Sequence, residues 1–201
     1  MSTTLPLVAA VTGASGAPYA VRLLQALAAA GQPTWLIVSE HGFRLLETES
    51  GIASMEELRD RVGSAAWDSS MRVFDDRDRG ALPASGSVQT KGMVICPCSM
   101  GTVAAIAHGT SRSLIERAAD VVLKERRRLV VVPRETPYSD IHLENMLRLT
   151  RAGAVVLPAS PGFYHRPTRV EELVDFVVGR ILDHVEVAHE LPRWTGSPDP
   201  T

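Results

Sequence analysis

The residues best able to do chemistry stand in short polar segments that follow apolar runs. The first segment, residues 99–102 (Ser-Met-Gly-Thr), follows the apolar run 93–96 and opens an alanine-rich stretch typical of a helix. The first backbone N–H groups of a helix lack partners within it and carry the positive end of its dipole. The segment therefore predicts a phosphate site, although an ordinary strand-to-helix connection would look the same.

A second segment, residues 12–17, follows the apolar run 5–11. Its small side chains let a ligand approach the backbone, and the helix expected behind it begins with Pro18, whose missing N–H costs nothing there. It is a second candidate phosphate cradle. It is not a dinucleotide fingerprint, because Ser15 replaces the second glycine, nor a hydrolase nucleophile elbow, because Ala17 replaces the last one.

Two more polar sites follow apolar runs. Ser39 comes after residues 34–38, at the strand end where open α/β sheets bind ligands, and serves equally well as a helix N-cap. Arg134 and Glu135 follow residues 129–132 between two prolines. They offer a guanidinium fork for phosphate and a carboxyl group that can move a proton, with a structural ion pair as the alternative.

Composition excludes several classes of protein. With 201 residues, 45% hydrophobic residues and a net charge of −2, the chain suits one globular domain rather than a disordered chain or a nucleic-acid binder. We place that domain at residues 1–190, with a tail at 191–201. Cys96 and Cys98 are too close to staple distant segments and lack zinc-site spacing, which favours a reducing cytoplasm.

Neither the N-terminal apolar run nor the acidic residues 75–78 predict a functional site. The N-terminal apolar run breaks at residues 12–13, well short of a membrane span, so we expect an untargeted, soluble protein without a membrane partner. Residues 75–78 (Asp-Asp-Arg-Asp) have the wrong spacing for a magnesium cluster and read as a solvated loop. We therefore expect no metal site and a small molecule or another protein as partner.

Apolar runs and helical patterns alternate along the whole chain, which predicts an α/β fold with a parallel sheet covered on both faces. The expected strands are 5–11, 34–38, 71–74, 93–96, 129–132 and 155–157, and the expected helices are 18–30, 43–49, 55–62, 113–127, 140–151 and 170–185, besides the one after residue 99. The rigid loop 158–167 displays Phe163 and Tyr164 beside cations, which suits a small apolar group on a phosphate or a subunit contact.

Six segments stand in the order typical of the UbiX-type flavin prenyltransferases, flavoproteins long labelled aromatic-acid decarboxylases, and the chain resembles that family over nearly its whole length. They are TGASGAPYA, VICPCSMGTVAAIAHG, LIERAADVVLKERR, VPRETPYSDIHLENM, PGFYHRP and LPRW. The resemblance implies a three-layer flavodoxin/Rossmann-like fold, reduced FMN as bound substrate and dimethylallyl monophosphate as prenyl donor. It also implies prenylated FMN as product for UbiD-type decarboxylases, and a homo-oligomer, a dodecamer, with sites at subunit boundaries.

The resemblance also implies residue roles. The flavin site would comprise Gly13, Ala14, Ser15, Ser39, Ser99, Met100, Gly101, Thr102 and Arg134. The prenyl phosphate would be bound by Lys124, Tyr164 and Arg180, and the chemistry would involve Glu135, Glu49 and Ser15. Some relatives have a tryptophan where this chain has Arg79, which leaves the flavin ring and Trp194 as candidates to shield a prenyl cation.

The expected reaction forms two bonds, as flavin N5 displaces the phosphate and the alkene closes onto flavin C6, with Glu135 or the phosphate moving the protons. Two other functions stay open. One is an FMN-dependent decarboxylase of a cysteine-derived substrate, although Asn145-Met146 lies outside the Pro-x-Met-Asn pattern of those enzymes. The other is a non-catalytic FMN carrier subunit. The pathway served, ubiquinone synthesis or aromatic-acid breakdown, also stays open.

Overall fold

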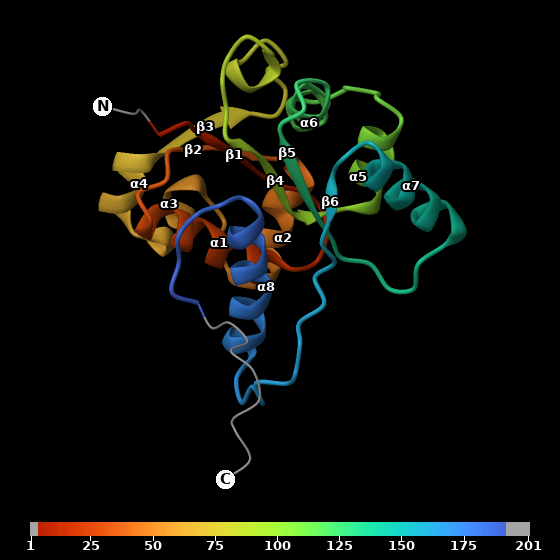
Figure 1. Cartoon of the computed structure of the whole chain (residues 1–201). Coiled ribbons are helices and arrows are strands. Elements are labelled where there is room, and N and C mark those ends of the chain that lie inside the picture. Colours follow the sequence, from red (N-terminus) through yellow and green to blue (C-terminus); the bar gives the residue numbers. More distant parts are fainter. Residues whose placement is uncertain (1–3, 192–201) are drawn as a thin grey trace.

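A six-stranded sheet forms the centre of the computed structural model, which describes residues 4–191 (Figure 1). The strand order is β3-β2-β1-β4-β5-β6, and neighbouring strands pair in parallel. The chain therefore reverses its direction of travel across the sheet between β1 and β4, where doubly wound folds bind ligands. The strands are β1 (Leu7–Val11), β2 (Thr34–Val38), β3 (Met71–Asp75), β4 (Gly92–Cys98), β5 (Arg128–Pro133) and β6 (Val155–Val156).

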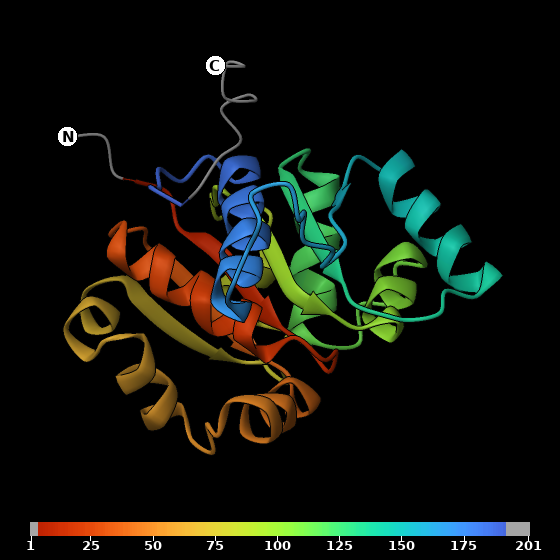
Figure 2. The same cartoon turned by 90° about the horizontal axis from the view of Figure 1, so that it is seen from below.

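Helices cover both faces of the sheet, as Figure 2 shows, and give the expected three layers. One face carries α1 (Ala17–Ala29), α2 (Glu40–Ser50), α3 (Met55–Val62), α4 (Ser64–Ser70) and α8 (Val170–His184). The other carries the short 3-10 helix η1 (Leu82–Ala84), α5 (Met100–Ala107), α6 (Leu114–Lys124) and α7 (Asp140–Arg151).

The apolar runs are continuous because alternate residues of each central strand enter different cores. In β1, Leu7, Ala9 and Val11 pack beneath α1 and α8, whereas Val8 and Ala10 face the α5 and α6 side. Among residues 4–191, no helix is long and apolar enough to cross a membrane.

The structure corrects several predicted boundaries. Strand β4 continues to Cys98 rather than ending at Cys96, because a register shift after Ile95 accommodates a proline that cannot donate to the sheet. Helix α2 begins at Glu40 rather than at residue 43, and α6 ends at Lys124 rather than at residue 127. Helix α4 was not predicted, since Trp67 is its one buried residue. The predicted tail, including Trp194, lies outside the described residues beyond Leu191.

Candidate functional site

Thr12 joins the two loops at the reversal point of the sheet. Its hydroxyl donates to the Pro97 carbonyl at 3.1 Å and accepts from the Ser99 amide at 2.8 Å. Because Thr12 is only 3% exposed, these buried hydrogen bonds fix the loop after β1 against the loop after β4. The start of α5 is thereby held at the carboxyl edge of the sheet.

A cavity of about 230 Å³ opens at that edge, beside the ends of β1, β2, β3 and β4. The first residues of α2, α5 and α6 all line it, so the positive ends of three helix dipoles point toward one place. The side chains around it comprise five hydroxyl groups, one imidazole, one isoleucine and two carboxylates, and the hydroxyl groups can donate to an anion. The lining residues are Thr12, Gly13, Ser39, His41, Asp76, Ser99, Thr102, Ser113, Ile115 and Glu116.

The two predicted serines are the N-caps of helices at this cavity. The Ser39 hydroxyl accepts from the Gly42 amide at 3.0 Å, and the Ser99 hydroxyl accepts from the Thr102 amide at 3.2 Å. For Ser39 the capping alternative is therefore correct, and its hydroxyl proton is still available to a ligand. The structure thus shows both serines as helix caps beside the cavity.

The start of α5 has unused hydrogen-bond donors. Within residues 4–191, no group accepts from the amides of Met100 and Gly101. Gly101 is exposed, and a Cβ atom built on it would have the Ser99 hydroxyl as its nearest contact, at 3.9 Å. Two unpaired amides in the first turn of a helix are a candidate site for a phosphate.

Glycines allow the loop after β1 to pack against the start of α2. A Cβ atom on Gly13 would come within 2.5 Å of the His41 Cβ, and one on Gly42 within 2.5 Å of the Val11 carbonyl oxygen. No side chain fits at either position. Gly13 is thus required by this close approach, which brings the Ser39 cap beside the Ser99 cap.

The two carboxylates that line the cavity accept hydrogen bonds from residues at or just before the start of α6. Asp76 accepts from the Ile115 amide at 2.9 Å, and Glu116 accepts from the Arg112 amide and the Thr110 hydroxyl, both at 2.7 Å. Burial would raise the pKa of Glu116, but the hydrogen bonds from Arg112 and Thr110 outweigh it and lower the pKa. Within the described range, no group of three or more His, Cys, Asp or Glu side chains is placed to hold a metal ion.

The second predicted cradle, at the start of α1, holds one of the protein's own carboxylates. Glu49 accepts from the Gly16 and Ala17 amides, each at 2.8 Å. Partial burial would raise the pKa of Glu49, but these amides, the Ser15 hydroxyl and the charge of Arg134 together lower it. Glu49 is therefore an ionised cap of α1 at neutral pH.

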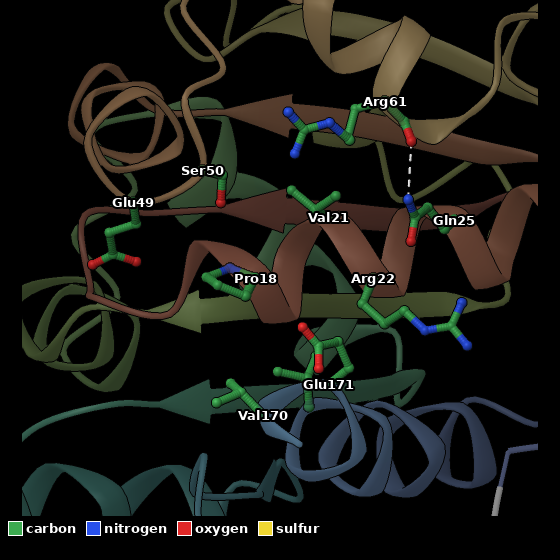
Figure 3. Close-up of a pocket in the computed structure, with 10 residues that line it drawn as sticks. Pro18, Val21, Arg22, Gln25, Glu49, Ser50, Arg61, Val170 and Glu171 are labelled. Carbon is green, nitrogen blue, oxygen red and sulfur yellow. Dashed lines mark hydrogen bonds between the residues drawn. The ribbon is translucent and has the colours of Figure 1, made fainter.

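Figure 3 shows Glu49 at one end of a groove of about 440 Å³ between α1 and the start of α8. The groove is largely apolar, with Pro18, Val21 and Val174 among its lining residues. Its Arg22 is paired with Asp175, which leaves that guanidinium less suited to binding a free anion.

Arg134 lies against the same loop. Its Nε donates to the Ser15 carbonyl at 3.0 Å, so the end of β5 is tied to the loop after β1. Arg134 and Glu135 form no ion pair with each other among the described residues. The structural ion pair, which was the alternative to a functional role, is therefore not observed. The Glu135 carboxylate instead accepts from the Thr136 amide at 3.1 Å. Ser15, Glu49 and Arg134 thus form one cluster.

One chain does not bring Lys124, Tyr164 and Arg180 together. Lys124 ends α6, which starts at the cavity and runs about 16 Å to the opposite edge of the sheet. Arg180 belongs to α8, on the other face, where it pairs with Asp183 at 3.1 Å. Tyr164 lies in the loop before α8 and contacts the ring of Phe176. A single phosphate cannot touch both cations of one chain.

Family comparison identifies the kind of protein to which this site belongs. The Flavoprotein family model matches residues 1–182. The flavin prenyltransferase UbiX of Pseudomonas aeruginosa is 51% identical over an alignment 193 residues long, which covers 92% of this chain and 91% of that protein. The chain belongs to the UbiX flavin prenyltransferase family. The resemblance drawn from its motifs is thereby confirmed.

Solved structures of UbiX proteins have the same fold. AnUbiX (PadA1), in complex with FMN and dimethylallyl pyrophosphate, gives a TM-score of 0.89 at 40% identity and covers 98% of this chain and 100% of that one. The dodecameric FMN-dependent UbiX-like decarboxylase of Escherichia coli O157:H7 gives 0.87 at 41% identity, with 96% and 100% coverage. The predicted three-layer α/β fold is confirmed.

Sequence reasoning missed Thr12 and Asp76. Thr12 was included in the second cradle only as a small residue, and its role depends on a hydrogen bond to a loop 85 residues away. Asp76 was assigned to a solvated loop, because nothing local reveals that it caps a helix 39 residues later. A polar residue next to a strand end was the available indication for both.

Proposed function

We propose that this protein transfers the dimethylallyl group of dimethylallyl monophosphate to N5 and C6 of reduced FMN and releases prenylated FMN. Its membership of the UbiX family carries this proposal, together with the relative crystallised with FMN and dimethylallyl pyrophosphate. That donor and the monophosphate share the prenyl group and a terminal phosphate.

The flavin site that we assign fits its ligand. The unused amides at the start of α5 and the Ser39 and Ser99 hydroxyls suit the FMN phosphate. The loop after β1 and the Arg134 guanidinium continue from that cavity toward Glu49. We therefore propose that the flavin is held by Gly13, Ala14, Ser15, Ser39, Ser99, Met100, Gly101, Thr102 and Arg134.

Reduced FMN, when bound, supplies the nucleophilic N5 and C6 positions. We propose that Lys124, Tyr164 and Arg180 stabilise the charge that grows on the departing phosphate, which preorganised cations and hydroxyls do well in a site poor in water. Because Lys124 and Arg180 lie on opposite faces of one chain, the site must combine residues of neighbouring copies. A homo-oligomer follows, and the dodecameric relative makes a dodecamer our proposal.

Glu135 is the proposed proton carrier. Glu49 already accepts two backbone N–H groups and its pKa is lowered, so it is poorly suited to hold a proton at neutral pH. Among residues 4–191, the Glu135 carboxylate has one hydrogen bond, from the adjacent Thr136 amide. We expect Glu135→Gln to slow product formation about 100-fold while FMN affinity is retained. Anaerobic product assays and FMN titration would measure both, and full activity would remove the proposed role.

The remaining proposals concern the domain bounds, the enzyme that uses the product and the cellular compartment. One flavoprotein domain would span residues 1–190, and the product would serve a UbiD-type decarboxylase. A reducing cytoplasm would suit Cys96 and Cys98, which are buried free thiols whose pKa values are raised by that burial.

The proposal is tested by anaerobic incubation of the protein with reduced FMN and either dimethylallyl monophosphate or dimethylallyl pyrophosphate. Mass analysis of the released flavin should show a gain of one five-carbon prenyl unit, with the monophosphate as the preferred donor. Unaltered flavin from protein that binds FMN would contradict prenyl transfer and support a carrier or a decarboxylase of cysteine-derived substrates.

A further inference from the structure

The end of α6 holds an ion pair that the proposed reaction has not yet used. The Lys124 ammonium contacts the carboxylate of Glu125, its neighbour in the chain. Both side chains are partly exposed, 48% for Lys124 and 34% for Glu125, so a ligand or a neighbouring subunit can reach them. The Lys124 charge thus has a protein partner before any phosphate arrives.

Gly86 provides the space in which this pair sits. A Cβ atom on Gly86 would collide with the Glu125 carboxylate and would lie 2.7 Å from the Lys124 Nζ. Gly86 does not have a positive φ, so its backbone conformation is open to other residues. A side chain at residue 86 would therefore displace the ends of the Lys124 and Glu125 side chains.

Arg127 prevents the Gly86 loop from moving away. Its guanidinium donates to the Gly86 carbonyl at 2.8 Å and to the Val88 carbonyl at 2.7 Å. Both bonds tie the loop to Arg127, just beyond the end of α6. The ammonium, its carboxylate and the loop beside them consequently form one connected unit.

We propose that Glu125 and Gly86 position the Lys124 ammonium for the prenyl phosphate. The inference rests on the proposed role of Lys124 in binding that phosphate. An ammonium has three N–H donors, so Glu125 can hold one while the others are directed to the phosphate. Glu125 is a positioning residue, because it acts through Lys124 and needs no contact with substrate.

The charge of Glu125 suits this role. The hydrogen bond and charge of Lys124, with the charge of Arg127, lower the pKa of Glu125. The carboxylate therefore stays ionised at neutral pH and remains attached to the ammonium.

Gly86→Ala tests the inference most cleanly. Only the far ends of two flexible side chains must move, so we expect folding to be unchanged while the ammonium is displaced. The KM for dimethylallyl monophosphate should rise about tenfold, with FMN affinity unaltered. Gly80→Ala is the matched control, because the nearest atom to its Cβ would be 3.4 Å away, and it should keep the wild-type KM.

Glu125→Ala should raise the same KM about tenfold, and Glu125→Gln, which keeps an acceptor but loses the charge, about threefold. In the double variant Gly86→Ala/Glu125→Ala the Cβ atom at residue 86 still meets the Lys124 ammonium, so its KM should rise at least as much as that of Glu125→Ala. Glu144→Ala, on the exposed side of α7, is the control. Thermal melting would check folding, and Gly86→Ala alone decides the matter if Glu125→Ala is unstable.

Lys124→Ala separates this inference from the proposed function. If Lys124→Ala loses activity while Gly86→Ala and Glu125→Ala keep the wild-type KM, the positioning role is overturned. If Lys124→Ala itself keeps the wild-type KM and rate, the phosphate role of Lys124 fails instead. A raised KM in all three, with FMN affinity unchanged, supports the inference.

Discussion

Helices α1 and α5 begin alike but have different partners. Each follows a central strand of the sheet, β1 or β4, and each is preceded by small residues that predict a phosphate cradle. The first amides of α1 are bonded to Glu49, whereas those of Met100 and Gly101 at the start of α5 have no acceptor within residues 4–191. The start of α1 is therefore bonded to a carboxylate of the same chain, whereas the start of α5 leaves room for the anion of a ligand.

The difference limits what a small-residue loop before a helix indicates. A carboxylate at a helix N-terminus takes the electrostatic place that a phosphate would take. Such a loop thus predicts an anion without revealing whether it is a ligand or a side chain of the same protein. We propose that the flavin phosphate binds at α5 and that Glu49 keeps it from α1.

The largest expected effect comes from making α5 resemble α1. Gly101→Asp places a carboxylate in the first turn of α5, where it suits the helix dipole but repels a phosphate. We expect FMN affinity, measured by fluorescence titration, to fall about 100-fold with no loss of thermal stability. Gly101→Ala should stay within about threefold of wild type. Near-normal FMN binding by Gly101→Asp would place the phosphate elsewhere.

Removing the α5 cap should have a smaller effect. Ser99→Ala deletes the hydroxyl that accepts from the Thr102 amide, so the free energy of unfolding should fall by about 1 kcal/mol in urea titrations. The same hydroxyl is a proposed flavin ligand, and FMN affinity should fall about tenfold. A loss of stability without a loss of affinity would show that Ser99 only caps the helix.

Glu49→Gln should have the smallest effect on FMN affinity, within about threefold, because the α1 amides are not assigned to the flavin phosphate. At pH 7 the free energy of unfolding should fall by about 1 kcal/mol through loss of the charged cap. The pKa of Glu49 is lowered from 4.5 in the folded protein, so its contribution is present above 4.5 and lost as pH falls below it.

The difference in stability between wild type and Glu49→Gln should therefore shrink as pH falls below 4.5, as urea titrations across that range would measure. A difference that grows on acidification would contradict the capping role. An FMN affinity as weak as that of Ser99→Ala would instead show that the α1 amides hold the flavin.

Local patterns predicted the strands and the helix caps well. β2 has the predicted bounds because Thr34–Val38 is a short apolar segment between turn residues. The Ser39 cap could be predicted because serine after a strand end is a common N-cap, whereas Ser99 was predicted only as part of a phosphate segment. In both cases the determining interactions lie within a few residues.

Contacts between distant segments could not be predicted from patterns. Glu49 meets Gly16 across 33 residues, from a polar helix that shows no local sign of this contact. Only family resemblance pointed to Glu49, and likewise to Lys124 and Arg180, which one chain keeps on opposite faces. Such residues depend on packing between helices or between subunits, which composition and periodicity do not encode.

A crystal structure of the FMN complex tests the difference between α1 and α5 most directly. We predict the FMN phosphate within hydrogen-bond distance of the Met100 and Gly101 amides, with Glu49 still bonded to Gly16 and Ala17. A phosphate bound at Gly16 and Ala17, with Glu49 displaced, would contradict the account.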